Sequence, residues 1–196
     1  MPGHKFNPSQ LQRLDNPKRR ALLPPEKILR DVEADQQSVW ADIGCGAGYF
    51  TVPLAEAVEK VFALDISPEM LAELEKRIVE RQINNVEVLQ SEESDIPLAD
   101  ASVNGVILAL VAHELHEPQK FLQELARCLK PWGRLIIVEW RKEATEMGPP
   151  VDHRLEEADV DSWALWCGLG KGRVWHWSNT FVGLEYIKGI DTGLPN

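Results

Sequence analysis

Short β-branched and apolar runs alternate along this chain with longer amphipathic stretches. The runs predict strands over residues 38–42, 60–65, 86–90, 103–110 and 134–140. Helices are predicted between them over 50–58, 68–82 and 118–129, the last two opening with Pro68 and Pro118 at the first helical position. Several strands are continuously apolar, as parallel strands covered on both faces are. The alternation therefore predicts an α/β fold with a doubly wound, mostly parallel sheet.

The last part of the chain departs from this rhythm. A helix is predicted over 156–167, stopped by Gly168, and two strand-like runs follow closely over 173–177 and 180–187. With so short a connection these two strands predict an antiparallel hairpin. The first 37 residues are helical and interrupted by prolines. We expect one domain over 1–196, made of a cap (1–37), a βαβ core (38–140) and a C-terminal helix with its hairpin (141–196).

Composition limits the class of protein. A net charge of -10 disfavours nucleic-acid binding, which requires basic residues to neutralise phosphates, and the one dense basic run, Lys18-Arg19-Arg20, is typical of a solvated helix end. The longest apolar run, residues 106–112, is too short to span a bilayer. The N-terminus lacks the apolar stretch of a signal peptide, so we expect a cytoplasmic protein that is not bound to membrane or nucleic acid.

The chain's most specific motif is a glycine loop between the first strand and the next helix. It reads Asp42-Ile43-Gly44-Cys45-Gly46-Ala47-Gly48, and Asp65 ends the second strand, where it is placed to accept hydrogen bonds from two ribose hydroxyls. Glycine lets the backbone turn sharply and approach a ligand. A tight strand-to-helix turn without a ligand is the simpler alternative.

Spacing distinguishes between the nucleosides that such a loop could bind. The dinucleotide fingerprint would place glycine or alanine at position 49, where this chain has Tyr49. The carboxylate of Asp42 would repel a pyrophosphate but suits a ligand that carries an ammonium group and a sulfonium charge. The motif therefore favours a methyl donor over NAD.

Three stretches carry a family resemblance: VWADIGCGAGYFTVPLA, VFALDISPEML, and the block from DIPLADASV through HELHEP to LQELARCLKPWGRLIIVEW. Together they resemble a class I S-adenosylmethionine-dependent methyltransferase, nearest to the small bacterial ubiquinone/menaquinone-type (type 11-like) enzymes. The resemblance runs from about Phe6 to Ile187. It implies a Rossmann-like sheet of seven strands whose last two form the hairpin, and S-adenosylhomocysteine as a product.

The resemblance also implies roles for residues of the donor site. The methionine end of the donor would meet Asp42, Gly44, Cys45, Gly46 and Gly48. Asp65 would hold the ribose, Ile66 would pack beside the adenine, and Glu92 with Glu93 would lie near its amino group. Ala109 and Leu110, after the fourth strand, would floor the methyl-donor site.

The chain departs from the family pattern at two places. It has Val103-Asn104 where the family usually has Phe-Asp, which removes a charge at the start of a strand. It has Pro131-Trp132-Gly133 where the family has Pro-Gly-Gly, which puts a bulky ring where the chain usually turns with glycine. Neither touches the donor site as mapped.

The acceptor half of the reaction is less constrained. Transfer from a sulfonium is an in-line displacement, and a base is needed only if the acceptor must first lose a proton. His113 is the candidate base, with a purely structural role as the alternative. Its spacing to His116 does not match a zinc motif, and a third ligand such as His153 would be distant, so no metal site is predicted.

Other acceptors and functions stay open at this point. The Asn/Asp-Pro-Pro-aromatic motif of nucleobase amino methyltransferases is missing after the fourth strand. Metalloid chemistry would need cysteines near the acceptor, and Cys45, Cys128 and Cys167 have no metal-binding spacing; free thiols in a reducing compartment are expected.

We therefore expect an enzyme that methylates an unidentified small molecule. The alternatives are a noncatalytic donor-binding or protein-interaction module and, less favoured, metalloid or NAD-dependent chemistry. Arg141 and His153 are acceptor-side candidates. The tryptophans near the C-terminus, Trp140, Trp163, Trp166, Trp175 and Trp177, indicate core packing or a subunit contact in preference to an aromatic acceptor pocket. The oligomeric state is left open.

Overall fold

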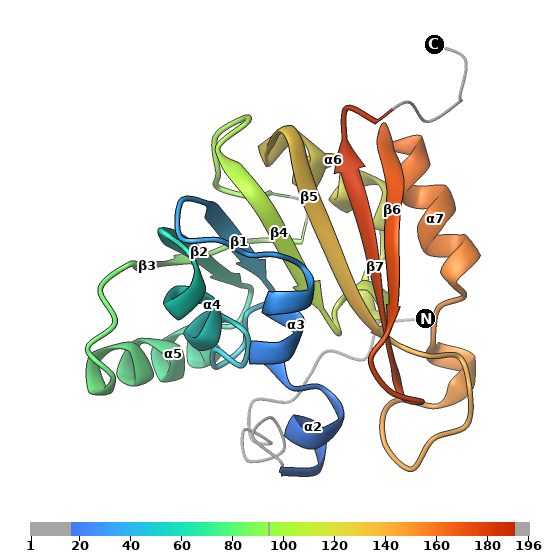
Figure 1. The fold of residues 1–196 in the computed structure, drawn as a ribbon, viewed down its shortest axis with the longest axis horizontal. Helices are drawn as coiled ribbons and strands as arrows, with labels where there is room; N and C mark the ends of the chain where they lie inside the picture. The colour runs from blue at the N-terminus through green and yellow to red at the C-terminus, as the bar shows by residue number, and fades with distance from the viewer. Residues whose placement is uncertain (1–16, 94, 191–196) are drawn as a thin grey trace.

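The computed structural model describes residues 17–93 and 95–190. The strands in this part of the chain form one seven-stranded sheet of order β3-β2-β1-β4-β5-β7-β6 (Figure 1). Its strands are β1 (Val39–Ile43), β2 (Lys60–Asp65), β3 (Val86–Gln90), β4 (Val103–Ala109), β5 (Leu129–Trp140), β6 (Leu169–His176) and β7 (Phe181–Lys188). The first five in chain order are mutually parallel, and β7 pairs antiparallel with both β5 and β6. The predicted mostly parallel sheet with a terminal hairpin is confirmed.

Helices cover the sheet on both faces (Figure 1). Their bounds are α2 (Pro17–Leu22), α3 (Pro25–Asp31), α4 (Thr51–Ala57), α5 (Pro68–Glu80), α6 (Pro118–Cys128) and α7 (Glu157–Trp166), with 3-10 turns η2 (Ala112–Glu114) and η3 (Val151–His153). Helices α3, α4 and α5 lie on one face, and α6 and α7 on the other. This is the doubly wound arrangement that continuously apolar strands require.

Local sequence explains where the long helices begin. The Ser67 side chain accepts a hydrogen bond from the backbone N–H of Met70 at 3.3 Å, and Pro68 follows it at the first helical position of α5. In α6 the buried residues Phe121, Leu122 and Leu125 recur at helical spacing against the sheet. These starts agree with the residues that the sequence predicts.

Strand β5 starts earlier than its predicted first residue, Arg134. The β4–β5 register runs from Val103 opposite Leu129 to Gly105 opposite Arg134, so the ladder takes up the intervening residues of β5 as a bulge. Trp132 lies in this bulge with a left-handed φ of +64° and a 68% exposed side chain. Because the ring points to solvent, the bulge accommodates a tryptophan where the family pattern has glycine.

The other departure from the family pattern also finds partners. The Asn104 side-chain oxygen accepts hydrogen bonds from the backbone N–H of Val39 at 3.0 Å and from the Lys130 ammonium at 2.9 Å. An amide oxygen therefore joins β1, β4 and the β5 bulge without the carboxylate of the family pattern.

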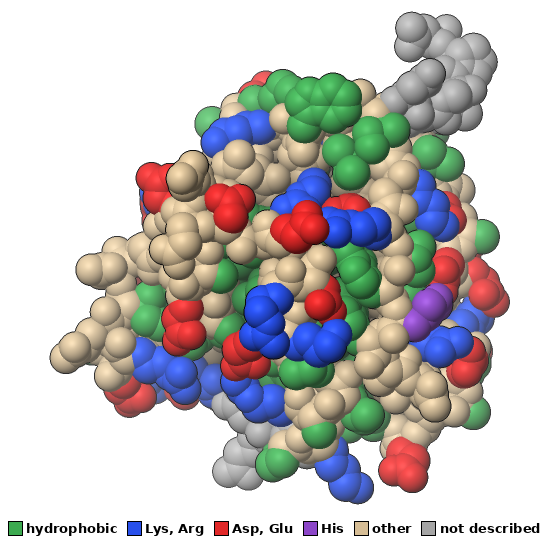
Figure 2. Space-filling view, viewed as in Figure 1, with side chains coloured by type: hydrophobic (Ala, Val, Ile, Leu, Met, Phe, Trp, Pro, Cys, Tyr) green, Lys and Arg blue, Asp and Glu red, His purple; other side chains and the backbone are tan. Residues whose placement is uncertain are grey.

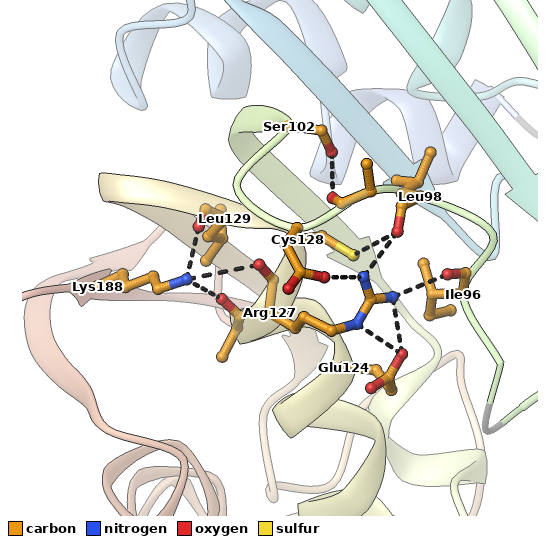
Figure 3. Close-up of polar contacts among 11 residues, drawn as sticks. Ile96, Leu98, Ser102, Glu124, Arg127, Cys128, Leu129 and Lys188 are labelled. Carbon is orange, nitrogen blue, oxygen red and sulfur yellow. Dashed lines mark hydrogen bonds and ion pairs between the residues drawn. The ribbon is translucent and has the colours of Figure 1, made fainter.

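Arg127 of α6 fastens the chain segment that leads from β3 to β4 (Figure 3). Its guanidinium donates to the carbonyls of Ile96 at 3.0 Å and Leu98 at 2.7 Å, and pairs with Glu124 at 2.8 Å and Asp100 at 2.7 Å. Charged hydrogen bonds of this kind are stronger than neutral ones. The segment after β3 is thereby held against the sheet.

Lys188, at the end of β7, donates hydrogen bonds to carbonyl groups at the C-terminal end of α6 (Figure 3). Its ammonium donates to the carbonyls of Ala126 and Leu129, both at 2.7 Å. The last carbonyls of a helix lack intrahelical partners and carry partial negative charge, so a lysine there is stabilising. The hairpin is in this way tied to α6 as well as to β5.

Two of the C-terminal tryptophans share one face of the hairpin, as predicted. The rings of Trp175 and Trp177 stack with centroids 5.6 Å apart, and Trp177 Nε1 donates to the carboxylate of Asp31 in α3 at 2.8 Å. Trp140 packs on Phe181 with centroids 4.5 Å apart. The Trp177–Asp31 bond ties α3 to the hairpin, and the ring contacts favour the packing interpretation of these three tryptophans.

On the face shown in Figure 2, basic and acidic side chains are interspersed and do not form a single positive field. Among the described residues, no helix is long and apolar enough to cross a membrane.

Candidate functional site

The glycine loop turns back on the end of the neighbouring strand. Gly44 has a left-handed φ of +68°, and the backbone N–H groups of Gly44 and Cys45 both donate to the Leu64 carbonyl, at 2.8 and 2.9 Å. One carbonyl at the end of β2 therefore fixes the start of the loop that follows β1.

Glycine is required at Gly44 by space as well as by φ. A Cβ built on Gly44 would lie 2.4 Å from Cγ2 of Val111, the second residue after β4. A Cβ on Gly48, whose φ is +91°, would lie 2.6 Å from the Leu74 side chain of α5. The loop is consequently packed between the chain that leaves β4 and the helix that follows β2.

Asp65 ends β2 and faces the loop. Its Oδ2 accepts a hydrogen bond from the backbone N–H of Gly46 at 2.8 Å, and its Oδ1 accepts one from Ser67 at 2.9 Å. Burial raises the pKa of Asp65, and these amide bonds partly oppose the rise. Each carboxylate oxygen can accept a further bond, which a pair of ribose hydroxyls could use. The neighbouring Ile66 leaves 44% of its surface exposed, as an apolar wall for a base would.

Asp42 lies behind the loop in β1 and is 2% exposed. The Thr51 hydroxyl of α4 donates to its Oδ2 at 2.6 Å. Burial raises the pKa of Asp42 to about 7, and the Asp65 charge adds to the rise, against the Thr51 bond. A ligand with a positive charge near this carboxyl would favour its ionised form. The same surroundings, burial first and then the two aspartates, raise the pKa of the Cys45 thiol.

The two predicted adenine-side glutamates follow β3, beside Asp65. Glu92 is exposed, whereas Glu93 turns toward the chain after β4. The Glu93 carboxylate accepts a bond from the His116 backbone N–H at 2.6 Å and lies 3.1 Å from His116 Nδ1. Burial opposes ionisation of Glu93, but these bonds and the His116 charge lower its pKa. The pair joins two loops at the edge of the site.

The residues at the end of β4 complete the same edge. Ala109 is half-buried, and Leu110 turns the chain with a left-handed φ of +61° while its N–H donates to the Val138 carbonyl of β5 at 2.8 Å. This turn directs Val111 onto Gly44. The structure therefore brings the predicted donor residues of β1, β2 and β4 to one edge, at the carboxyl ends of the parallel strands.

Glu139, a buried residue that the sequence analysis did not identify, contacts the side chain of His113. Glu139 of β5 is 2% exposed, and both of its carboxylate oxygens are 3.0 Å from His113 Nδ1. Burial opposes protonation of His113, but the hydrogen bond and charge of Glu139, with a smaller contribution from Glu114, outweigh it and raise the pKa. The sequence held one signal of this pair, a glutamate at the end of the apolar run of β5.

The predicted acceptor-side residues, Arg141 and His153, flank a loop that is organised by a different residue. Arg154, 4% exposed, donates to four carbonyls of this loop, at Arg141 (2.9 Å), Glu143 (2.7 Å), Met147 (3.0 Å) and Pro149 (3.0 Å). The side chain of Arg141 pairs with Glu143, and His153 is exposed. The backbone of the loop is therefore held in place by the buried side chain of Arg154.

Among residues 17–93 and 95–190, no group of three or more histidine, cysteine, aspartate or glutamate side chains could hold a metal ion.

Comparison with known proteins identifies relatives of this site and fold. A family model described as a methyltransferase domain matches residues 41–137. A demethylmenaquinone methyltransferase from a Geobacillus species is 29% identical over 124 residues, covering 62% of this chain and 53% of that protein. An arsenite methyltransferase from Halobacterium salinarum is 32% identical over 126 residues, covering 62% of this chain and 29% of that protein. The chain thus spans about half or less of the length of these curated relatives.

A solved structure matches over nearly its whole length. The crystal structure of a SAM-dependent methyltransferase from Aquifex aeolicus has a TM-score of 0.88 and 36% sequence identity to this chain. The match covers 93% of this chain and 99% of that one. The similarity therefore extends beyond the donor motif to the last strands of the sheet.

The contact of Gly44 with Val111 predicts an unequal cost for two glycine substitutions. Gly44→Ala adds a left-handed alanine and a steric overlap, so we expect it to lower the free energy of unfolding by about 2–4 kcal/mol. Gly168 has a similar φ of +75° but nothing within 4 Å of its Cβ position. Gly168→Ala should therefore cost only the backbone strain, about 1 kcal/mol. Urea unfolding of both variants measures the difference, and equal losses would argue against the overlap.

The raised pKa of Asp42 predicts that the free energy of unfolding depends on pH. Its pKa is about 7 in the folded protein and near 3.8 when unfolded, so the folded state binds more protons between these values. Stability contributed by the protonated form is then lost as the pH rises through this window, by up to roughly 4 kcal/mol. Asp42→Asn should remove that loss, so its stability relative to wild type should increase from pH 4 to 7. Urea unfolding across this range tests it, with Asp152→Asn, at an exposed site, as the control; parallel curves for Asp42→Asn and wild type would contradict the prediction.

Proposed function

Because this chain belongs to the S-adenosylmethionine-dependent methyltransferases, we propose that it methylates a small molecule that first loses a hydroxyl proton to His113. The observation that carries this proposal is the His113–Glu139 pair, which lies at the carboxyl ends of β4 and β5. The glycine loop lies at the same edge of the sheet. A base and a donor site on one edge can act on one acceptor.

The donor half of the proposal uses the residues of the loop. Asp65 would accept hydrogen bonds from the ribose hydroxyls, and the exposed Ile66 would pack against the adenine. Glu92 and Glu93 would lie toward its amino group. Asp42 and the segment containing Gly44, Cys45, Gly46 and Gly48 would face the methionine end, with Ala109 below the transferred methyl. When bound, the donor supplies a methyl group on a positively charged sulfur.

The charge at the edge suits such a donor. Asp42 and Asp65 both have raised pKa values, chiefly through burial, and among the described residues no cationic side chain compensates their ionised forms. A sulfonium and an ammonium group would supply that charge. Donor binding should accordingly favour ionisation of both carboxyls.

The acceptor half depends on proton removal. A neutral hydroxyl is a weak nucleophile, and a positioned base that takes its proton in the transition state typically gains about 100-fold to 10,000-fold in rate. The raised pKa of His113 means that it is protonated to a higher pH than an ordinary histidine. Turnover should therefore rise with pH through a value above 6.5.

The cysteines argue against metalloid chemistry, although an arsenite methyltransferase is among the relatives. Burial is the chief cause of a raised pKa in Cys45, in Cys128 and in Cys167, whose pKa is about 11. Thiolates are the form that binds soft ions, and raised pKa values disfavour them at neutral pH. One relative is named a demethylmenaquinone methyltransferase, and the acceptor class that we favour is a hydroxylated ring such as the reduced form of a quinone.

Asp65→Ala tests the donor half. Loss of hydrogen bonds to a charged group should weaken binding of S-adenosylhomocysteine by about 1.5–3 kcal/mol. Calorimetry of wild type and variant measures this, with Glu75→Ala as a matched control that removes an exposed carboxylate from α5. Unchanged affinity in Asp65→Ala, or binding of NAD instead, would contradict the donor assignment.

His113→Ala tests the acceptor half. Transfer of labelled methyl groups to reduced 1,4-naphthoquinone (a soluble hydroquinone) should exceed transfer to arsenite, and His113→Ala should lower it about 100-fold or more. S-adenosylhomocysteine affinity should stay nearly the same, and His176→Ala, at an exposed site, should behave as wild type. Preferential methylation of arsenite, or full turnover by His113→Ala, would refute the proposed acceptor chemistry.

A further inference from the structure

Glu139 is surrounded by hydrogen-bond donors. Its Oε1 accepts from the His113 backbone N–H at 3.2 Å, and its Oε2 accepts from the Trp140 backbone N–H at 3.1 Å. His113 Nδ1 lies 3.0 Å from both oxygens. Each Glu139 oxygen therefore acts as an acceptor toward one backbone N–H.

This arrangement fixes the tautomer of the histidine. An ionised carboxylate has no proton to donate, so the nitrogen that faces it must carry the hydrogen. In neutral His113 the proton therefore lies on Nδ1, and the lone pair lies on Nε2. The distance from Nε2 to Glu114 Oε1 is 3.9 Å, beyond a hydrogen bond.

We infer that Glu139 is a positioning residue that keeps the proton of neutral His113 on Nδ1 and thereby makes Nε2 the nitrogen that takes the acceptor's proton. The inference rests on the proposed function for its catalytic meaning, but the tautomer itself can be measured without any acceptor. Glu139 acts through His113 and does not contact the reacting atoms.

The step balances in protons and electrons. The acceptor's O–H bond breaks and its proton goes to Nε2, while the electron pair of the deprotonated hydroxyl makes the oxygen, or a ring carbon conjugated with it, nucleophilic. That pair forms the new bond to the methyl carbon, and the carbon–sulfur pair returns to sulfur, which becomes a neutral thioether. The positive charge moves from sulfur to His113, where the Glu139 carboxylate stabilises it.

Three charged groups set the titration of His113. Glu139 faces it from β5 and Glu114 from η2, and both favour the protonated ring. Arg154, after η3, opposes protonation. Together with burial these groups leave the pKa raised, so loss of the Glu139 charge should lower it and move the acid limb of turnover to lower pH.

The first test measures the tautomer by nitrogen NMR of protein labelled with ¹⁵N-histidine. The chain has five histidines, and the His113 signals are assigned as those missing from His113→Gln. Above the pKa, wild type should show a proton on Nδ1 and none on Nε2. In Glu139→Gln the side-chain amide can donate to Nδ1, so the proton should move to Nε2. Glu117→Gln, which removes an exposed carboxylate four residues from His113, should leave the His113 signals unchanged.

The second test measures turnover of the reduced naphthoquinone against pH. Glu139→Gln should lower it on the order of 100-fold and shift its acid limb downward, with S-adenosylhomocysteine affinity retained as evidence of folding. Glu139→Asp keeps the charge and should restore the Nδ1 proton and part of the turnover.

Several outcomes would overturn the inference. A proton on Nε2 in wild type would do so even if Glu139→Gln fails to fold. So would a tautomer unaffected by Glu139→Gln, or an unshifted pH profile. If the naphthoquinone is not methylated, the proposed acceptor fails while the NMR result still decides the role of Glu139. A failed tautomer test would leave methyl transfer itself in place.

Discussion

The contact between the glycine loop and two neighbouring strand ends is the constraint on which the site depends. The Leu64 carbonyl of β2 accepts the N–H groups of both Gly44 and Cys45, and Val111 beyond β4 occupies the space that a Cβ on Gly44 would need. The chains leaving β1, β2 and β4 are therefore fixed relative to one another by one turn. Parallel strands bring their carboxyl ends to one edge, and this turn sets the spacing between groups at that edge.

Charge is arranged differently in the two halves of the site. On the side predicted to bind the donor, burial raises the pKa values of Asp42 and Asp65, and these carboxyls lack a cationic side chain within hydrogen-bond distance among the described residues. Glu139 is as deeply buried as Asp42, yet His113 and two backbone N–H groups surround it. The first environment suits a cationic ligand, whereas the second holds a side chain of the protein itself in a defined orientation.

The sequence was informative where a residue's neighbours along the chain determine its structure. Apolar runs located the parallel strands, and proline with an N-cap serine located α5. The predicted start of β5 at Arg134 was wrong because Pro131-Trp132-Gly133 is typical of a turn, whereas the sheet accommodates these residues as a bulge within the strand. Glu139 and Arg154 were missed because their partners are distant in sequence or are backbone carbonyls, which no residue pattern reveals. The roles of the donor residues remain predictions that binding experiments must decide.

Arg154 shows how a loop can keep its shape while its surface changes. The arginine binds carbonyl oxygens at Arg141, Glu143, Met147 and Pro149, and it does not depend on their side chains. Every amino acid carries a backbone carbonyl, so substitutions along this loop leave the four bonds available. Substitutions along the loop can therefore change the surface that its side chains present while the four bonds that hold its backbone are kept.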